Sequence, residues 1–423
     1  MDHISVIGAG LAGCEAASRI SAAGIHVKLY EMKPEKRSPA HSSDGFAELV
    51  CSNSLKASRV NSAAGLLKHE MRRLGSICLE AAAACEVPAG GALAVDRDEF
   101  SRLVTQRILS DGNIEVVHGE VTQLPDEGIT VIATGPLTSD GFAETIRGLC
   151  GDSLSFYDAA APIVTYESVD MTRAFTASRY GRGGDCDYIN CPMNKAEYEE
   201  FYAALVSAER AFVHEFDVYE GCMPVEVLAS RGEDAMRFGP LKPVGLRDPS
   251  TGKRPWAVLQ LRRENSAGTL LNLVGFQTNL KFGEQKRVFS MIPALRNAEF
   301  VRYGVMHRNS FINSPKLLNR DYSLRERPNV FFAGQITGVE GYMESAGSGI
   351  LAGINAARRF KNEEPFVLEP TSMLGALTAY ICDETVKDFQ PMGANFGILP
   401  PLSERIRDKQ ERYMAYARRS PLF

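Results

Sequence analysis

The sequence predicts an α/β fold in which a Rossmann-like domain is interrupted by an inserted α+β domain. Apolar runs typical of strands alternate with helical stretches, and 37 glycines are spread among them. A glycine-rich turn follows the first apolar run, and a glycine-rich helix is predicted late in the chain. Because both features serve one dinucleotide site, we expect the two ends of the chain to share a domain.

The first predicted unit is a strand, a glycine turn and a helix. The strand covers residues 3–7, the helix covers residues 14–23, and the turn between them consists of Gly8, Ala9, Gly10, Leu11, Ala12 and Gly13. Gly8 permits the tight turn, Gly10 lets a pyrophosphate approach the backbone, and Gly13 lets the helix pack close to the strand. The helix N-terminus favours the anion.

An acidic residue follows the second predicted strand. This strand covers residues 26–30 and leads into Glu31, which lies eighteen residues after Gly13. A carboxylate at this distance accepts hydrogen bonds from an adenosine ribose with a free 2′-hydroxyl. The sequence therefore predicts a dinucleotide site.

Two later segments favour FAD over NAD. Residues 128–135 form an apolar strand that ends in Ala-Thr-Gly, as in many flavoproteins. Residues 329–334 form another strand, and residues 344–359 form a helix rich in glycine. Gly334 and Gln335 would close the site, with Gln335 where flavoproteins usually have Asp. We find no second strand, glycine turn and helix unit, so a separate NAD(P)H domain is not expected.

Composition excludes several classes of protein. The chain has 423 residues and a net charge of -5, which favours two domains. It has no basic-apolar leader and no apolar run long enough to cross a membrane, so we expect a cytoplasmic protein. Nine cysteines in so long a chain are expected to be reduced. The spacing of cysteines and histidines predicts no metal site.

The middle of the chain is basic. Residues 241–310 contain twelve Lys and Arg and four Asp and Glu, which gives a charge of +8 and leaves -13 for the remainder. The tail adds basic residues after position 404. The asymmetry favours a local anionic partner such as nucleic acid, although a solvated charged face would have the same composition.

Several long motifs resemble one protein family. They cover residues 47–55 (AELVCSNSL), 88–97 (PAGGALAVDR), 221–224 (GCMP), 238–246 (FGPLKPVGL), 303–309 (YGVMHRN) and 334–342 (GQITGVEGY). These motifs are similar to those of the bacterial folate- and FAD-dependent tRNA (uracil-5-)-methyltransferases, and the resemblance covers nearly the whole chain. Gln335 is a feature of that family.

The resemblance implies a methyltransferase whose cofactor is FAD. A one-carbon unit would pass from 5,10-methylenetetrahydrofolate to carbon 5 of a T-loop uridine in tRNA, with NAD(P)H as reductant. The partners implied are tRNA, folate and NAD(P)H, without membrane or metal. Related alternatives are a flavoprotein that modifies the tRNA wobble uridine, an enzyme of the same chemistry acting on ribosomal RNA, and a non-catalytic RNA-binding protein that contains FAD.

Two cysteines within these motifs are the candidate catalytic residues. Carbon 5 of uracil is a poor nucleophile until a thiolate adds to carbon 6. We predict Cys222 as the nucleophile toward uracil and Cys51 as a second active-site thiol, and the assignment could be reversed. Five cysteines in apolar contexts are expected to be structural, namely Cys14, Cys78, Cys85, Cys150 and Cys382.

The two cysteines are predicted to come from different domains. The FAD-binding domain should consist of residues 1–155 and 323–423, because the two glycine-rich segments must meet at one cofactor. Residues 156–322 would form the inserted domain, which would contain Cys222 and the basic segment. The reaction would then take place between the two domains.

Overall fold

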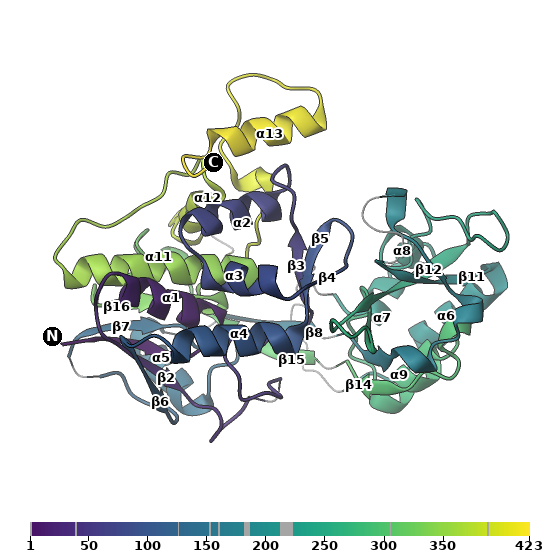
Figure 1. The fold of residues 1–423 in the computed structure, drawn as a ribbon, viewed down its shortest axis with the longest axis horizontal. Helices are drawn as coiled ribbons and strands as arrows, with labels where there is room; N and C mark the ends of the chain where they lie inside the picture. The colour runs from purple at the N-terminus through teal and green to yellow at the C-terminus, as the bar shows by residue number, and fades with distance from the viewer. Residues whose placement is uncertain are drawn as a thin grey trace.

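The computed structural model describes residues 2–38, 40–125, 127–151, 154–159, 161–181, 187–211, 223–304, 306–386 and 389–423. These residues form two lobes that lie side by side (Figure 1). The first lobe contains both ends of the chain, and the second contains the middle of it. Each lobe has a hydrophobic core of its own.

A five-stranded parallel sheet lies at the centre of the first lobe. Its order is β16-β7-β1-β2-β6, with bounds Val330–Phe332, Ile129–Ile132, Ile4–Ile7, Val27–Glu31 and Ile114–His118. In the central strand, Ile4 pairs with Val27 on one side and with Ile129 on the other. β1 and β7 are buried along their whole length, as expected of a sheet covered on both faces. The predicted Rossmann-like α/β fold is confirmed.

Helices and a small sheet complete the first lobe. The helices are α1 (Leu11–Ala22), α2 (Ala63–Arg73), α3 (Ile77–Ala84), α4 (Arg97–Leu109), α5 (Asp140–Cys150), α10 (Ser314–Leu317), α11 (Tyr342–Phe360), α12 (Met373–Ile381) and α13 (Lys409–Arg419). The small sheet consists of β3 (Ser54–Ala57), β5 (Ala92–Val95) and β4 (Glu86–Val87), in that order.

Helices α1 and α11 cross at very short range, because glycine removes side chains at their contact. A Cβ atom on Gly349 would lie 2.2 Å from the carbonyl oxygen of Ala12, and one on Gly353 would lie 2.6 Å from that of Ala16. The glycines of the late helix therefore bring the two ends of the chain together.

The second lobe is an α+β unit. Its antiparallel sheet has the order β10-β11-β12-β13-β9-β14, with bounds Phe175–Thr176, Ile189–Met193, Ala257–Arg263, Leu270–Leu273, Ile163–Thr165 and Phe300–Arg302. Its helices are α6 (Lys195–Ser207), α7 (Val225–Ala229), α8 (Ala235–Phe238) and α9 (Phe282–Phe289). Phe201, Phe276 and Phe289 pack together in its core.

A pair of antiparallel strands connects the lobes. β8 (Leu154–Ala159) leads out of the first lobe, and β15 (Met306–Phe311) returns to it. The first core includes Phe311, Leu318 and Tyr322, whereas the second extends from Val164 to Ala298. The boundaries at residues 156 and 322 remain predictions. Among the described residues, no helix combines the length and the apolar character needed to span a bilayer.

Candidate active site

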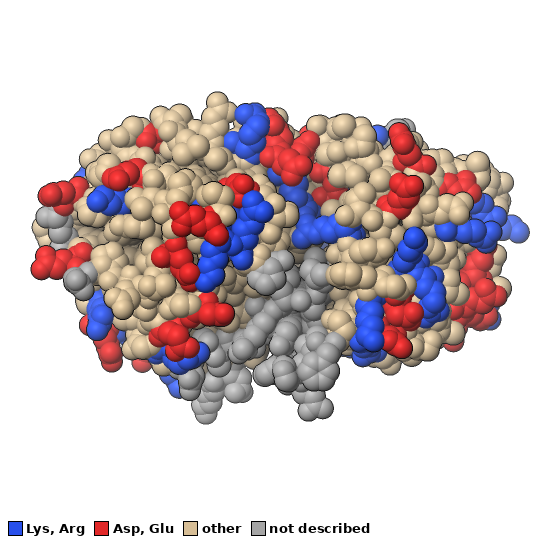
Figure 2. All heavy atoms as spheres, turned by 90° about the horizontal axis from the view of Figure 1, so that it is seen from below, with Lys and Arg blue, Asp and Glu red and all other residues tan. Residues whose placement is uncertain are grey.

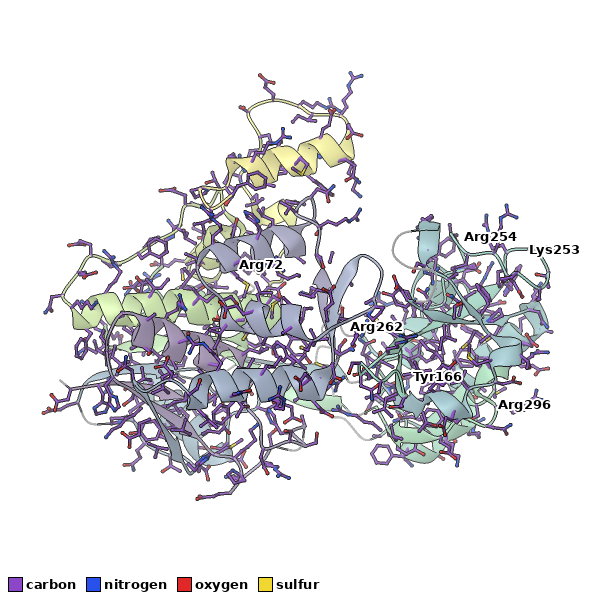
Figure 3. All side chains as sticks on the ribbon, in the orientation of Figure 1. Arg72, Tyr166, Lys253, Arg254, Arg262 and Arg296 are labelled. Carbon is purple, nitrogen blue, oxygen red and sulfur yellow. The ribbon has the colours of Figure 1, made fainter. Side chains whose placement is uncertain are left out.

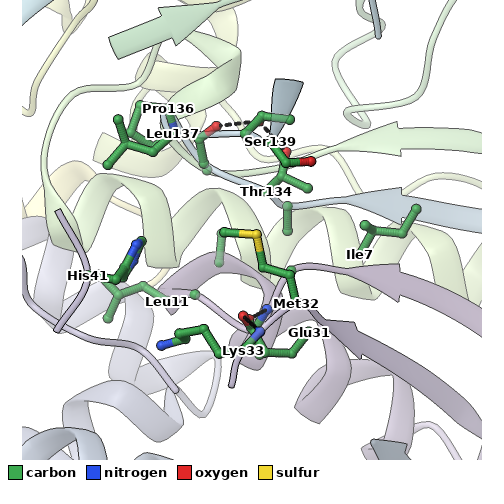
Figure 4. A pocket seen from close by; sticks show the side chains of 18 of the residues that line it. Ile7, Leu11, Glu31, Met32, Lys33, His41, Thr134, Pro136, Leu137 and Ser139 are labelled. Atoms are coloured by element: carbon green, nitrogen blue, oxygen red, sulfur yellow. Dashed lines mark hydrogen bonds between the residues drawn. The ribbon is translucent and has the colours of Figure 1, made fainter. Parts of the chain in front are cut away.

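One pocket lies at the carboxyl ends of the five parallel strands. The residue that follows each of four strands lines it, namely Gly8, Met32, Gly119 and Ala133, and so does Gly334, the second residue after β16. Figure 4 shows Glu31 and Lys33 on one wall and Thr134 and Ser139 on the opposite wall. Ligands of open α/β sheets bind at this edge, so the pocket is the expected dinucleotide site.

The three fingerprint glycines have different surroundings. Gly8 has a φ of +99°, and a Cβ atom on it would lie 2.7 Å from the carbonyl oxygen of Ala133. A Cβ atom on Gly13 would lie only 1.8 Å from the carbonyl oxygen of Gly8. Gly10 has nothing within 4 Å of its Cβ position and lines the pocket. Packing therefore requires Gly8 and Gly13, whereas Gly10 leaves the backbone open to a ligand.

Two helix N-termini meet at the pocket. Helix α1 begins after Gly10 and helix α11 after Gly341, and no described side chain caps either end. Leu11, Ala12 and Tyr342, from their first turns, line the pocket. The first amides of a helix have no acceptor within the helix, and its dipole favours negative charge there. The pocket is thus suited to an anionic group such as a pyrophosphate.

Glu31 holds the glycine loop in place. Its carboxylate is buried and accepts hydrogen bonds from the backbone amides of Ala9 (2.9 Å) and Lys33 (3.0 Å). Each carboxylate oxygen still has a second lone pair for a ribose hydroxyl. Besides its predicted contact with the ribose, Glu31 therefore fixes the turn that surrounds the pyrophosphate site.

Gly334 and Gln335 lie where the last strand reaches the pocket. Gly334 has a φ of +86°, and its amide donates to the hydroxyl of Ser348 at 2.7 Å. The side-chain amide of Gln335 donates to Glu340 at 2.6 Å. The Gln335 side chain is thus held in place by Glu340 where it lines the pocket.

Cys51 lies beside this pocket and contacts Tyr342. The phenol oxygen of Tyr342 accepts hydrogen bonds from the backbone amides of Cys51 (2.8 Å) and Ser52 (3.2 Å), and the Cys51 sulfur lies 3.1 Å away. Because the two amides occupy both lone pairs of this oxygen, its hydrogen is directed to the sulfur. Burial raises the pKa of Tyr342 well above its usual value, and the nearby Cys51 raises it further. The phenol therefore stays protonated and donates to Cys51.

Two arginines of the second lobe hold the Cys51 loop. Arg302 donates to the carbonyl oxygen of Val50 at 2.6 Å. Arg262 donates to Asn53 and Ser52, each at 3.0 Å. Figure 3 shows Arg262 between the lobes, and Figure 2 shows Lys and Arg atoms gathered where the lobes meet. Burial lowers the pKa of both guanidinium groups from their usual values. Arginine stays charged even so, and positive charge near a thiol favours the thiolate.

The other described cysteines are poor nucleophile candidates. Cys14, Cys78, Cys85, Cys191 and Cys382 are buried, and Cys150 is half-buried. Burial raises the pKa of all six thiols, to about 12 for Cys85, Cys150, Cys191 and Cys382 and well above the usual value for Cys14 and Cys78. The structure thus gives Cys51 a setting that none of these six shares.

Cys222 lies outside the described residues, as does Cys186. The chain resumes at Met223, and α7 begins two residues later, on the side of the second lobe that faces the first (Figure 1). The buried Glu226 of α7 accepts hydrogen bonds from Thr278 and Asn279 and so anchors the start of this helix. The described residues contain no group of His, Cys, Asp and Glu that could hold a metal ion.

Comparison with known proteins identifies the family. The family described as "Glucose inhibited division protein A" matches residues 3–364. A protein of Acetivibrio thermocellus named "Methylenetetrahydrofolate--tRNA-(uracil-5-)-methyltransferase TrmFO" is 60% identical over 424 residues, which are 99% of this chain and 97% of that protein. A protein of the same name from Lactiplantibacillus plantarum is 58% identical over 421 residues, 99% of this chain and 95% of that one. The chain belongs to the TrmFO family.

The resemblance inferred from the sequence motifs is therefore confirmed. Solved structures support the fold of this TrmFO family member as well. Two crystal forms of Aquifex aeolicus GidA match it with TM-scores of 0.71 and 0.72, at 16% and 15% sequence identity. The matches cover 92% and 99% of this chain, and 68% and 74% of those chains.

Sequence reasoning did not single out Tyr342, Arg262 or Arg302 as site residues. Tyr342 ends the motif of residues 334–342 and directly precedes the glycine-rich segment, and this position was the signal available in the sequence. The two arginines were counted only as part of the basic segment. Nothing in the sequence separates them from its solvent-exposed cations.

Proposed function

We propose that the protein is a flavin- and folate-dependent RNA methyltransferase. It transfers a one-carbon unit from 5,10-methylenetetrahydrofolate to carbon 5 of the T-loop uridine of tRNA, with NAD(P)H as reductant. The observation that carries this proposal is the hydrogen-bonded pair of Cys51 and Tyr342 beside a dinucleotide pocket, in a chain 60% identical to a relative named for this reaction. Such a reaction on tRNA is consistent with a cytoplasmic location.

The pocket residues fit FAD. The open backbone at Gly10 and the N-termini of α1 and α11 suit its pyrophosphate, and Glu31 suits its adenosine ribose. Gly334 and Gln335 would contact the part of FAD nearer the flavin ring. When bound, the reduced flavin supplies the electrons that convert the transferred methylene unit to a methyl group. No metal is needed for this reaction.

The thiols and their neighbours account for activation of uracil. In our assignment the Cys222 thiolate adds to carbon 6, and the electrons of the C5–C6 double bond move to the carbonyl oxygen at C4. Carbon 5 then attacks the methylene carbon of the one-carbon donor and loses its proton. The bond between that carbon and the donor nitrogen breaks, with the electron pair leaving on nitrogen. A hydride supplied by the reductant adds to the same carbon as the thiolate leaves carbon 6, which restores the C5–C6 double bond and leaves a methyl group. Cys51, which accepts a hydrogen bond from the hydroxyl of Tyr342, is the second thiol of this site. The reverse assignment uses the same steps.

The test of the proposal is methyl transfer to a tRNA transcript in the presence of 5,10-methylenetetrahydrofolate and NAD(P)H. Mass spectrometry of the digested RNA should locate one methyl group on a T-loop uridine. Cys222→Ala should abolish transfer and leave bound FAD unchanged. A methyl group at the wobble position or on ribosomal RNA alone would contradict the proposal, and so would RNA binding without any turnover.

A further inference from the structure

An open groove on the second lobe lies apart from the flavin pocket. It runs between the end of β11, helix α8 and the loop that precedes β12. Figure 3 shows Lys253 and Arg254 at the outer end of this lobe, whereas Arg262 lies between the lobes. No residue lines both this groove and the flavin pocket. The groove is therefore a separate feature of the molecule.

Positive charge dominates the groove although the whole chain is acidic. Six cationic side chains line it against the two carboxylates of Glu197 and Asp248; the six are Arg173, Lys195, Arg237, Lys242, Lys253 and Arg254. Arg173, Lys195 and Arg237 form ion pairs with acidic neighbours. The other three form no ion pair with any described residue, and Lys253 and Arg254 are exposed. These three cations are available to an anionic partner.

Aromatic side chains accompany these cations. Phe238, at the end of α8, is 81% exposed and contacts no other described ring. Trp256 lies under the guanidinium of Arg237, 3.7 Å from the ring centroid. An exposed phenylalanine ring lacks the favourable free energy that burial would give it. Exposed aromatic rings next to cations are typical of surfaces on which nucleic-acid bases stack.

We propose that this groove binds unpaired nucleotides of the RNA substrate. A base stacks on Phe238, and phosphates of the same strand bind Lys242, Lys253 and Arg254. Single strands offer both the free base faces and the phosphates that such a surface accepts, whereas a duplex hides its base faces. An acidic peptide would leave Phe238 without a partner. The inference rests on the proposed function, and it adds an RNA contact remote from the reacting base.

The only tryptophan of the chain lies in the groove, which gives a direct readout. Titration with a tRNA transcript should change the fluorescence of Trp256, and an unpaired oligonucleotide should produce the same change. The variants are Phe238→Ala and the double substitution Lys253→Glu with Arg254→Glu. Arg296→Glu is the matched control, since Arg296 is an exposed cation of the same lobe that does not line the groove and lies away from Lys253 and Arg254 (Figure 3). Thermal unfolding confirms that each variant is folded.

We expect the double charge reversal to raise the Kd for tRNA about tenfold or more and to reduce its dependence on salt. Each phosphate contact on a single strand contributes about 0.7 to the slope of log K against log salt, so losing two contacts removes about 1.4. Phe238→Ala should raise the Kd by about five- to 150-fold, the value of one base–aromatic stack. Arg296→Glu should leave Kd within about twofold of the wild type.

The outcomes separate this inference from the proposed function. If the wild type methylates tRNA and both groove variants bind it with unchanged Kd, the groove proposal is wrong and the function stands. If the wild type binds tRNA through the groove but never methylates it, the function is wrong and the groove stands. Equal loss of affinity in Arg296→Glu would also overturn the groove proposal, because general charge would then explain the result. So would absence of RNA binding by the wild type.

Discussion

The flavin pocket of the first lobe and the groove of the second lobe are built from different parts of the chain. In the first lobe the pocket is made largely of backbone, namely its glycines and the uncapped amides of two helices. In the second lobe the groove is made of side chains, namely exposed cations and one exposed phenylalanine. Substitutions at the pocket should therefore have all-or-none effects on FAD binding, whereas those in the groove should have graded effects on RNA binding that depend on salt.

The Cys51 loop is contacted by residues of both lobes. Tyr342 from the first lobe contacts the thiol, while Arg302 and Arg262 from the second lobe contact the flanking residues. The candidate thiol thus depends on both lobes, although the loop itself belongs to the first. The relative position of the lobes is expected to affect reactivity as well as binding.

Among the residues that the structure describes, the largest effect on activity is expected at the Cys51 thiol. Cys51→Ala should reduce methyl transfer about 10³-fold or more, because removing a group that acts directly on the reacting atoms has effects of that size. FAD content and thermal unfolding should not change. Cys150→Ala is the matched control, since Cys150 is half-buried and burial raises its pKa to about 12. Wild-type turnover by Cys51→Ala would remove Cys51 from the mechanism.

A pair of glycine substitutions separates packing from ligand binding in the first lobe. Gly13→Ala should lower the free energy of unfolding by about 3 kcal/mol, because its Cβ atom would meet the carbonyl oxygen of Gly8 at 1.8 Å. Gly10→Ala meets nothing within 4 Å, so its stability should stay within about 0.5 kcal/mol of the wild type. It should nevertheless lose FAD, measured by flavin absorbance after gel filtration. Full retention of FAD by Gly10→Ala would contradict the assignment of the pocket.

The same contrast explains what the sequence could predict. The glycine turn, Glu31 and the late helix were predictable because backbone geometry ties their function to residue type and spacing. The predicted helix over residues 344–359 differs from α11 only at its ends. Contacts across the lobes, such as those of Arg262 and Arg302 with the Cys51 loop, join residues more than 200 positions apart in the chain, and no local pattern encodes them.

Arg302→Gln tests whether the second lobe activates the thiol of the first. The substitution removes a half-buried positive charge and a hydrogen bond to Val50, so methyl transfer should fall about 10- to 100-fold. The rate of thiol alkylation at Cys51, followed against pH by peptide mass spectrometry, should shift to higher pH. A merely structural role would not produce that shift. Arg296→Gln serves as the control, and an alkylation profile identical to that of the wild type would show that Arg302 only supports the loop.

The smallest expected effect concerns a buried charge in the first lobe. Lys68 is fully buried, donates to the carbonyl oxygens of Leu55 and Ala64, and has its pKa lowered by burial from 10.5 to about 8. At pH values between these two pKa values, the unfolded chain binds more protons than the folded chain. This lysine therefore makes the free energy of unfolding rise with pH in that range. From about pH 7 to about pH 9 the rise should be roughly 1 kcal/mol.

Lys68→Met should remove that rise. Methionine avoids the free-energy cost of burying a charge, and this gain offsets the loss of two hydrogen bonds. The variant should therefore differ little in stability from the wild type at about pH 7. At about pH 9 it should be the less stable of the two, because only the wild type has gained stability. Urea unfolding of both proteins at the two pH values measures the difference. If the difference in free energy of unfolding between the two proteins stays constant with pH, Lys68 keeps its usual pKa. The backbone carbonyls around it would then stabilise its charge within the first lobe.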